Sequence, residues 1–441
     1  MLFVYSILLA VGFILMSPLF LLRREKYAAG MKQRLGNYPE FKSDGRKVIW
    51  LHCVSVGETN AARPLVDDLL TTFPDHRLVI STTTKTGQEL AQKIFAEKAA
   101  AVVYFPFDFK FSVRRALEHF SPSIVLLMET EIWPRFIHEA KRAGAEVAIV
   151  NGRLSQRSVS RYKVVRPFIS RVLQDISLAL MQGSNDANRL ISLGMAAAKT
   201  IVTGNLKFDV GSTDADLAAT DFLRERFGFD GSRPLILAAS THEPEERIVL
   251  EAWCSVANGA TSVRPRLMVV PRHPERFKSV ARMIEDFRSD PACEWEDYTF
   301  AQRSRGEDVS DPEADVVLLD SIGELRAVYQ LADLVFVGGS LIPHGGQSIL
   351  EPASEGKAIV TGPHTHNFVD SVRVFLANQA LIQLPDVSAT AAADELFTTF
   401  CDLLDERERR EELGRNARAV MEANRGATEE TIRELRKIIS E

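Results

Sequence analysis

Glu58 follows a strongly apolar run in the first part of the chain and has the position expected of a general base. The run Lys47–Cys53 predicts a buried strand, and Gly57 stands just before the acid. Glycine suits a tight turn from a strand into a helix, which would place the Glu58 carboxylate in the first helical turn. A carboxylate there either caps the helix or accepts a proton from a substrate hydroxyl. Both interpretations stay open at this point.

A second acidic motif, Glu129-Thr130-Glu131, stands at the end of another apolar run. Two carboxylates this close could bind a metal ion, but Trp133-Pro134 follow at once and no third ligand is near in the sequence. A structural role, or a role in stabilising a transition state, is the stronger interpretation. Lys207 follows the last strand of this half, and we expect it to point into a cleft between two domains. Asp214-Ala215-Asp216 is interpreted as a solvated loop.

The second half of the chain has a glycine-rich motif suited to an anion. Gly338-Gly339 leave an apolar run, and Gly345-Gly346 are predicted to open a helix that carries Glu351 one turn in. Amide N–H groups at a helix start favour a phosphate, and Glu351 could accept hydrogen bonds from ribose hydroxyls. The alternative is a flexible loop with an ordinary helix cap.

Two further segments after apolar runs could contact the same anion. Arg272, within Pro271–Pro274, could hold a phosphate or a carboxylate, and Ser321–Glu324 is predicted to open another helix. The pair His364 and His366 is a weaker candidate, because no carboxylate is near it in the sequence. The sequence patterns of dinucleotide-binding, P-loop, serine-hydrolase and zinc-protease sites do not occur.

The segment between Val147 and Gln174 contains basic residues and no acid. Its basic residues are Arg153, Arg157, Arg161, Lys163, Arg166 and Arg171. Such a run is commonly the solvated face of a helix. The alternative is a surface for an anionic lipid head group.

Short apolar runs alternate with amphipathic helical stretches such as Ala61–Phe73 and Trp133–Ala143, which predicts two α/β domains with parallel sheets. The predicted strands are Lys47–Cys53, Arg77–Thr82, Ala101–Phe105, Ser123–Glu129, Glu146–Val150, Leu178–Gly183, Thr200–Gly204, Pro234–Ser240, Arg266–Pro271, Asp315–Asp320, Asp333–Gly339 and Lys357–Gly362. Phe287–Ser310 is predicted to be a surface loop. Ligands of open parallel sheets bind outside the carboxyl ends of the strands, which is where the residues described above stand.

Residues Leu2–Leu22 form an uncharged apolar run about as long as the hydrocarbon core of a bilayer is thick, roughly 30 Å. Basic residues follow the run, which predicts a retained single-pass anchor with the rest of the chain in the cytoplasm. A cleaved signal peptide and an interfacial helix are the alternatives. The expected organisation is an anchor over 1–23, a first domain over 24–207, a linker over 208–231, a second domain over 232–405 and a closing helix over 406–441.

Composition limits the class of protein. The chain has 441 residues, 46% of them hydrophobic, and a formal net charge of −6. These values are typical of a globular protein and exclude a disordered chain, a collagen-like chain and a basic protein that coats nucleic acid. Its four cysteines form no CxxC pair, which fits a reducing compartment.

After one N-terminal apolar helix, the chain contains in order the motifs HCVSVGE, ETEIWP, GNLKFD, PRHPERF, SIGEL and GGSLIPHGGQSILEPA. These motifs and their order resemble those of the Kdo (3-deoxy-D-manno-octulosonic acid) transferases of lipopolysaccharide assembly. The resemblance covers essentially the whole chain. It implies a GT-B glycosyltransferase fold, with two Rossmann-like domains facing a cleft and an N-terminal transmembrane helix at the inner membrane.

The resemblance also implies roles for individual residues. Glu58 matches the catalytic base, and Glu131 and Lys207 match residues that support the transition state. Segments that hold CMP match Pro271 and Arg272, Ile322, Gly323 and Glu324, and Ser348, Ile349, Leu350 and Glu351. At Ser348-Ile349 this chain departs from the Asn-Pro of the family pattern, which matters if the asparagine side chain contacts CMP.

The implied reaction is inverting transfer of Kdo from CMP-Kdo to a lipid A precursor, lipid IVA, without a metal or other cofactor. Glu58 would deprotonate the acceptor hydroxyl, and amide groups at Gly345-Gly346, with Arg272 or Lys207, would stabilise the leaving phosphate. Closure of the two domains would exclude water. Two alternatives stay open: another sugar-nucleotide enzyme such as a non-hydrolysing epimerase, and a membrane-tethered binding protein without activity.

Overall fold

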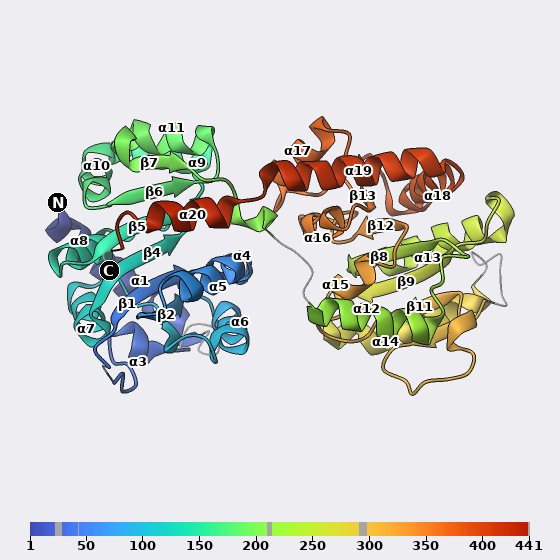
Figure 1. Cartoon of the computed structure of the whole chain (residues 1–441), viewed down its shortest axis with the longest axis horizontal. Coiled ribbons are helices and arrows are strands. Elements are labelled where there is room, and N and C mark those ends of the chain that lie inside the picture. Colours follow the sequence, from blue (N-terminus) through green and yellow to red (C-terminus); the bar gives the residue numbers. More distant parts are fainter. Residues whose placement is uncertain (23–28, 43, 210–213, 291–297, 440–441) are drawn as a thin grey trace. The chain divides into compact units, whose positions relative to one another are not determined.

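The computed structural model describes residues 1–22, 29–42, 44–209, 214–290 and 298–439, with side chains of the first helix described to residue 15. The chain divides into two compact units. Unit 1 comprises Met1–Asp209 and Asn424–Glu441, and unit 2 comprises Val210–Ala423. Each unit contains a seven-stranded sheet in which every described strand pair is parallel (Figure 1).

The sheet of unit 1 has the strand order β3-β2-β1-β4-β5-β6-β7. Its strands are β1 (Lys47–Cys53), β2 (His76–Thr82), β3 (Ala101–Tyr104), β4 (Pro122–Met128), β5 (Glu146–Gly152), β6 (Leu178–Met181) and β7 (Thr200–Val202). Its helices are α1 (Leu2–Leu22), α3 (Met31–Arg34), α4 (Val56–Ala61), α5 (Arg63–Thr72), α6 (Lys85–Phe95), α7 (Lys110–Phe120), α8 (Pro134–Arg142), α9 (Gln156–Val164), α10 (Arg166–Gln174), α11 (Ser184–Leu193) and α20 (Ala427–Leu435).

The sheet of unit 2 has the strand order β10-β11-β9-β8-β12-β13-β14. Its strands are β8 (Leu235–Thr241), β9 (Arg266–Pro271), β10 (Phe300–Gln302), β11 (Val316–Leu318), β12 (Leu334–Val337), β13 (Ala358–Thr361) and β14 (Ile382–Gln383). Its helices are α12 (Asp214–Phe227), α13 (Glu245–Ser255), α14 (Phe277–Asp286), α15 (Leu325–Tyr329), α16 (Leu350–Ser354), α17 (Val369–Ala377), α18 (Ala389–Asp405) and α19 (Arg407–Asn424).

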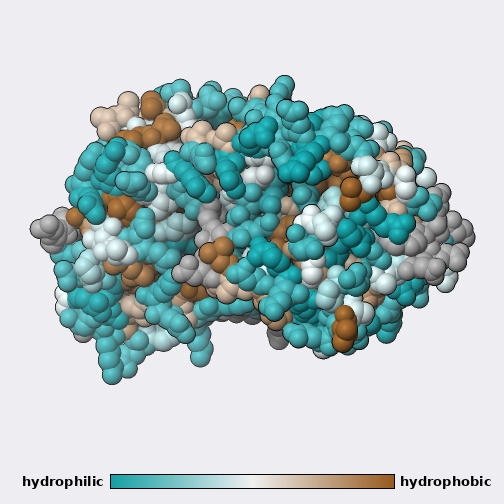
Figure 2. Space-filling view, turned by 45° about the vertical axis from the view of Figure 1, so that its right-hand side comes forward, coloured by the Kyte–Doolittle hydropathy of each residue, from teal (hydrophilic) through white to brown (hydrophobic). Residues whose placement is uncertain are grey.

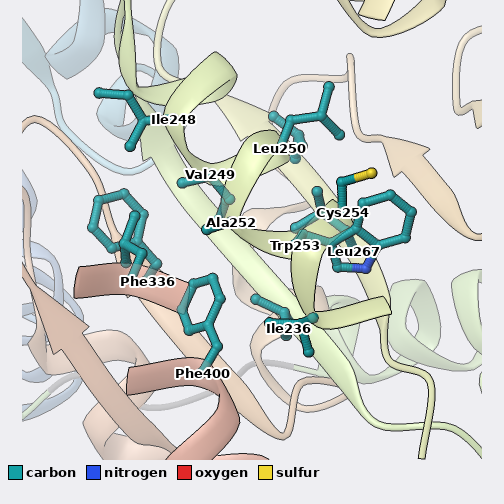
Figure 3. Packing of buried hydrophobic residues seen from close by; sticks show 14 of the residues in the cluster. Ile236, Ile248, Val249, Leu250, Ala252, Trp253, Cys254, Leu267, Phe336 and Phe400 are labelled. Carbon is teal, nitrogen blue, oxygen red and sulfur yellow. The ribbon is translucent and has the colours of Figure 1, made fainter. Parts of the chain in front are cut away.

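Apolar side chains on both faces of each sheet form the cores. In unit 2, Trp253 of α13 and Phe400 of α18 are fully buried together with Ile236 of β8 and Phe336 of β12 (Figure 3). A strand covered on both faces needs apolar residues at successive positions, which is why the continuous apolar runs predicted these strands. Figure 2 shows one face of the molecule on which hydrophilic residues predominate and hydrophobic residues form small scattered groups.

The C-terminal part of the chain returns to unit 1. Ala427, Ile432 and Leu435 of α20 pack in the same core as Leu65 and Leu69 of α5. Asp209 fixes the start of α20, because its carboxylate accepts the N–H of Gly426 at 2.8 Å and the N–H of Thr428 at 2.6 Å. Unit 1 is therefore built from two separate segments of the chain.

Three details differ from the sequence-based expectations. The expected linker 208–231 contains helix α12, whose Leu223 and Phe227 are fully buried. The expected closing helix over 406–441 is two helices, α19 in unit 2 and α20 in unit 1. The loop predicted over Phe287–Ser310 contains strand β10, and residues 291–297 of it lie outside the described residues.

The membrane helix predicted over residues 1–23 lies partly outside the described residues. Helix α1 extends over Leu2–Leu22. Within the described part of the chain, the length and apolar character that a membrane crossing requires are not found together in any helix.

Candidate functional site

Glu58 lies at the carboxyl end of β1, in the first turn of α4. Ser55 caps this helix, since its hydroxyl accepts the N–H of Glu58 at 3.4 Å. The Glu58 side chain folds back: Oε2 accepts the N–H of Val54 at 2.7 Å and Oε1 accepts the Ser55 hydroxyl at 3.1 Å. This arrangement is a variant of a capping box, in which the Glu58 carboxylate accepts the N–H of the residue before the N-cap instead of that of the N-cap itself. The capping interpretation therefore describes part of what Glu58 does.

The surroundings of Glu58 also suit proton transfer. Its side chain is 7% exposed. Burial, together with the charges of Glu129 and Glu131, raises the pKa of the Glu58 carboxyl to about 7, against the hydrogen bond from Val54 that lowers it. A carboxyl group with a pKa near neutrality is suited to general-base catalysis at physiological pH. Two hydrogen bonds leave lone pairs on both oxygens for a substrate proton.

Lys207 forms its ion pair with Glu129. The Lys207 Nζ lies 3.1 Å from Oε1 of Glu129, and both side chains are about two-thirds to three-quarters buried. Glu131 lies near the same group, and burial, followed by the charge of Glu129, raises its pKa. Three carboxylates and one ammonium thus gather at the carboxyl edge of this sheet. The family resemblance points to Glu131, and the structure adds Glu129 as the contact of Lys207.

Asn151 positions the segment that carries Lys207 and was not predicted from the sequence. Its Oδ1 accepts the N–H of Leu206 at 3.0 Å, and its backbone has a φ of 55° at the end of β5. Glu129 has a φ of 53° at the end of β4. Left-handed backbone in non-glycine residues is uncommon and clusters at functional sites. Asn151-Gly152 after an apolar run was the signal in the sequence, because asparagine tolerates this conformation.

The glycine-rich motif of unit 2 is arranged differently from the expectation. Helix α16 begins at Leu350, four residues after Gly346, and the N–H of Gly346 donates to the carbonyl of Gly339 at 2.7 Å. Gly345-Gly346 therefore do not open a helix, and the Gly346 amide is already used. Glu351 is the second residue of α16 rather than one turn in, and its Oε1 accepts from Arg326 Nε at 3.3 Å.

The other predicted CMP-binding residues also follow strands. Pro271 is the last residue of β9, and Arg272 follows it with an exposed side chain. After β11, Ile322 is 69% exposed and Gly323 has a φ of +98°. The Glu324 carboxylate accepts from Arg303 Nε at 3.1 Å and from Nη2 at 2.9 Å.

The last predicted segment precedes and opens α16. The Ser348 hydroxyl accepts the N–H of Leu350 at 3.4 Å, and Ile349 is the buried N-cap residue. Because β11, β9, β8 and β12 are consecutive in the sheet, the segments after these strands share one edge of unit 2. Among the described residues, no group of three or more His, Cys, Asp or Glu side chains is arranged to hold a metal ion.

Comparisons with known proteins agree with this arrangement. A family model described as "3-Deoxy-D-manno-octulosonic-acid transferase (kdotransferase)" matches residues 29–210. The 3-deoxy-D-manno-octulosonic acid transferase of Haemophilus influenzae is 34% identical over 402 residues, which are 91% of this chain and 90% of that protein. The protein of the same name from Bordetella pertussis is 35% identical over 87% of this chain and 86% of its own.

Solved structures support the GT-B-like α/β fold with two parallel sheets. The UDP-GlcNAc 2-epimerase of Neisseria meningitidis, solved bound to UDP-GlcNAc, matches 89% of this chain and 100% of its own, with a TM-score of 0.57 and 15% identity. At this identity the likeness shows the fold alone. The two transferases, each more than 30% identical over most of both chains, carry the assignment of the family. This chain belongs to the 3-deoxy-D-manno-octulosonic acid transferase family.

Proposed function

We propose that this protein transfers Kdo from CMP-Kdo to a hydroxyl group of a lipid A precursor, lipid IVA, in lipopolysaccharide biosynthesis. The observation that carries the proposal is the state of Glu58. This carboxylate is buried, has a pKa of about 7, and keeps lone pairs free at the sheet edge where ligands of such folds bind. Membership of the Kdo transferase family supports the identity of the sugar.

Glu58 removes the proton from the acceptor hydroxyl as its oxygen attacks the anomeric carbon of Kdo. The new carbon–oxygen bond forms while the bond from that carbon to the CMP phosphate breaks, so CMP leaves with the electron pair and the anomeric centre inverts. Positive charge develops on the sugar in this transition state. The carboxylates of Glu129 and Glu131 lie near Glu58, and their negative charges stabilise the positive charge of the transition state. The ion pair with Lys207 holds Glu129 in place.

Unit 2 supplies the donor site in this proposal. The exposed guanidinium of Arg272 is suited to the phosphate of CMP. The exposed Ile322, beside Gly323 with its positive φ, offers an apolar surface for the base. Glu351 has a second carboxylate oxygen for a ribose hydroxyl. A bound nucleotide would accordingly contact the segments after β9, β11 and β12.

We further propose that the protein is held at the inner membrane by its N-terminal helix, with both units on the cytoplasmic side. One side of α1 is fixed to unit 1, because the Tyr5 hydroxyl donates to Asp108 at 2.8 Å and the Tyr5 ring lies 5.7 Å from that of Phe168. Apolar side chains exposed elsewhere on the helix are Phe3, Val4, Ile7, Leu8, Val11, Ile14 and Leu15.

The basic run supports contact with anionic lipid. Its members Arg153, Arg157, Arg161, Lys163, Arg166 and Arg171 are all exposed. Where α9 ends and α10 begins, Val164 is 83% exposed and Val165 is 46% exposed, so the basic residues Lys163 and Arg166 flank two exposed apolar side chains at this tip. Phe168 of α10 contacts Tyr5 of α1, which places the tip region beside the helix proposed as the anchor. Such a surface suits the phosphates of a glycolipid in a bilayer.

Product analysis tests the proposed reaction. Purified full-length protein is incubated with CMP-Kdo and lipid IVA, and the lipid is examined by mass spectrometry for the mass of added Kdo, which also counts the units transferred. Conversion of a UDP-sugar to its epimer, with no Kdo on the lipid, would favour the epimerase alternative. Binding of CMP-Kdo without any product would favour a binding protein.

Cell fractionation tests the location. We expect the full chain in the inner-membrane fraction, and a variant without residues 1–22 to be released in part. Replacing Arg157, Arg161 and Arg166 by glutamate in that shortened variant should release it further at low salt, because the remaining attraction is electrostatic. Protein that stays in the soluble fraction with its N-terminus intact would contradict the proposal.

A further inference from the structure

Three histidines meet at the carboxyl edge of the sheet of unit 2. His242 follows β8, His273 follows β9 and His344 follows β12, and these strands are neighbours in the order β9-β8-β12. The ring centroid of His242 lies 5.2 Å from that of His273 and 4.7 Å from that of His344. His242 is therefore the central ring of a cluster drawn from three loops.

The central ring has an unused polar atom. His242 is 8% exposed, and its Nδ1 has no hydrogen-bond partner among the described residues. The hydroxyl of the preceding residue, Thr241, is fully buried and likewise lacks a partner there. Most buried polar atoms in folded proteins are hydrogen-bonded, so two adjacent exceptions at a ligand-binding edge indicate a place where a ligand completes the hydrogen bonding.

The space beside this atom is kept open by a glycine. A Cβ placed on Gly339 would lie 3.4 Å from Nδ1 of His242 and 3.4 Å from Nε2 of Gln347. The imidazole and the amide therefore border the same small space. An oxygen atom in that space could accept a hydrogen bond from each of them.

The charges around the cluster favour an anion. Burial, together with the charges of His344 and His273, lowers the pKa of His242 to about 4, against a hydrogen bond with the backbone of Ser240 that raises it. The ring is therefore neutral at pH 7 and carries one N–H, which in the Nδ1-protonated tautomer is available to an anion. The buried acid next to it, Glu245, is fully engaged with the N–H groups of His242, Gly339, Ser340 and Leu341. Oε1 of Glu275 lies 3.8 Å from Nδ1 of His273, but the Glu275 side chain is 76% exposed, so solvent screens its negative charge.

We propose that His242, with His273 and His344 around it, forms an anion-binding subsite that takes an anionic oxygen of the sugar nucleotide. The oxygen belongs either to the phosphate of the nucleotide or to the carboxylate of the sugar, since both present the same acceptor. The inference rests on the proposed function of unit 2 as the donor site and adds three residues to it. The exposed Arg272 guanidinium supplies the net positive charge, and the neutral ring of His242 supplies a directed donor.

Binding and kinetics of the full-length protein in detergent test the subsite. The variants are His242→Ala, His242→Asn, which keeps a nitrogen close to the place of Nδ1, and His344→Ala at an exposed position where folding is insensitive. His138→Ala, in unit 1, is the matched control. The dissociation constants of CMP and cytidine are measured by calorimetry, and the KM for CMP-Kdo by transfer to lipid IVA.

If the subsite holds the phosphate, His242→Ala and His344→Ala weaken CMP binding about tenfold or more and leave cytidine binding unchanged. If it holds the sugar carboxylate, CMP binding is unchanged and the KM for CMP-Kdo rises by a similar factor. In either case His242→Asn recovers part of the loss, which a purely structural role of the ring would not produce.

Equal loss of cytidine binding, or unchanged CMP binding together with an unchanged KM in His344→Ala and His242→Ala, would overturn the subsite. In those results the wild-type protein still transfers Kdo, so the inference fails alone. A wild-type protein that neither binds CMP nor transfers Kdo would instead remove the proposed function, and the subsite with it.

Discussion

Each sheet carries a buried glutamate just after a strand in its middle, and the two side chains have different surroundings. Glu58 follows β1 in unit 1 and accepts two hydrogen bonds, one from an amide and one from a hydroxyl. Glu245 follows β8 in unit 2 and accepts four, all from backbone amides, at 2.6 to 3.0 Å. Burial raises the pKa of both carboxyl groups.

The number and source of the hydrogen bonds separate a reactive carboxylate from a structural one. A carboxylate has about four lone-pair positions, and four amides occupy all of those of Glu245. It therefore fastens the loop after β12 to the loop after β8, and with them His344 to His242. Glu58 keeps half of its positions free and stands near Glu129 and Glu131, which raise its affinity for a proton. Equivalent places in two similar sheets thus have different chemistry.

The largest expected effect is the loss of transfer activity when the reactive carboxylate, Glu58, is replaced. Glu58→Gln should lower the rate of Kdo transfer by about 10²- to 10⁴-fold, because the amide cannot accept the hydroxyl proton. CMP binding should stay within a few-fold of wild type. Transfer is followed with CMP-Kdo and lipid IVA, and the exposed Glu118→Gln in α7 is the control. Full activity in Glu58→Gln would remove this residue as the base.

Glu245→Ala tests whether this buried carboxylate stabilises the fold of unit 2. It leaves several buried amide N–H groups without an acceptor, so the free energy of unfolding should fall by about 2–4 kcal/mol. Urea unfolding of the variant measures this change. Glu251→Ala on the same helix, which removes a surface pair with Arg247, should cost less than about 1 kcal/mol. Equal stabilities of the two variants would contradict the assigned role of Glu245.

The pH dependence of transfer tests the role of Glu58 without a mutation. Glu58 must be ionised to act as a base, so kcat/KM should fall about tenfold per pH unit below its pKa of about 7. Above that pH the rate should reach a plateau. A profile that stays level down to pH 5 in wild type would mean that a group other than Glu58 accepts the proton.

The smallest effect concerns the neighbours of Glu58. Glu129→Gln removes a negative charge that raises the pKa of Glu58 and leaves Lys207 nearby. The acidic limb of the pH profile should therefore move to lower pH, by roughly half a unit to one unit. Glu131→Gln should move it in the same direction, and Glu118→Gln should not move it. A shift to higher pH would contradict the proximity of these charges.

Much of the fold could be predicted from the sequence because buried parallel strands have continuous apolar runs. All twelve predicted strands overlap described strands of the two sheets. Strands β10 and β14 were missed, since runs of three and two residues carry no periodic signal. The start of α16 was misplaced because Gly345 and Gly346 use positive φ to shape a loop, and their sequence alone resembles a helix opening.

The candidate site was predictable where a single segment contains the signal. Glu58 and Lys207 each follow a strand in the sequence, so the edge on which they lie could be predicted. The ion pair of Lys207 with Glu129 could not be predicted, because Glu129 has a left-handed backbone conformation that the sequence does not indicate. The histidine cluster was missed for a related reason: its members come from three distant loops that only the strand order brings together.

The return of the chain to unit 1 has a consequence for synthesis on the ribosome. Domains generally form as units while the chain emerges, the N-terminal one first. Here helix α20, which covers Leu65 and Leu69, is translated after all of unit 2. The middle of the polypeptide can complete its core before the beginning does, and until α20 arrives the nascent first half leaves an apolar surface that chaperones can recognise.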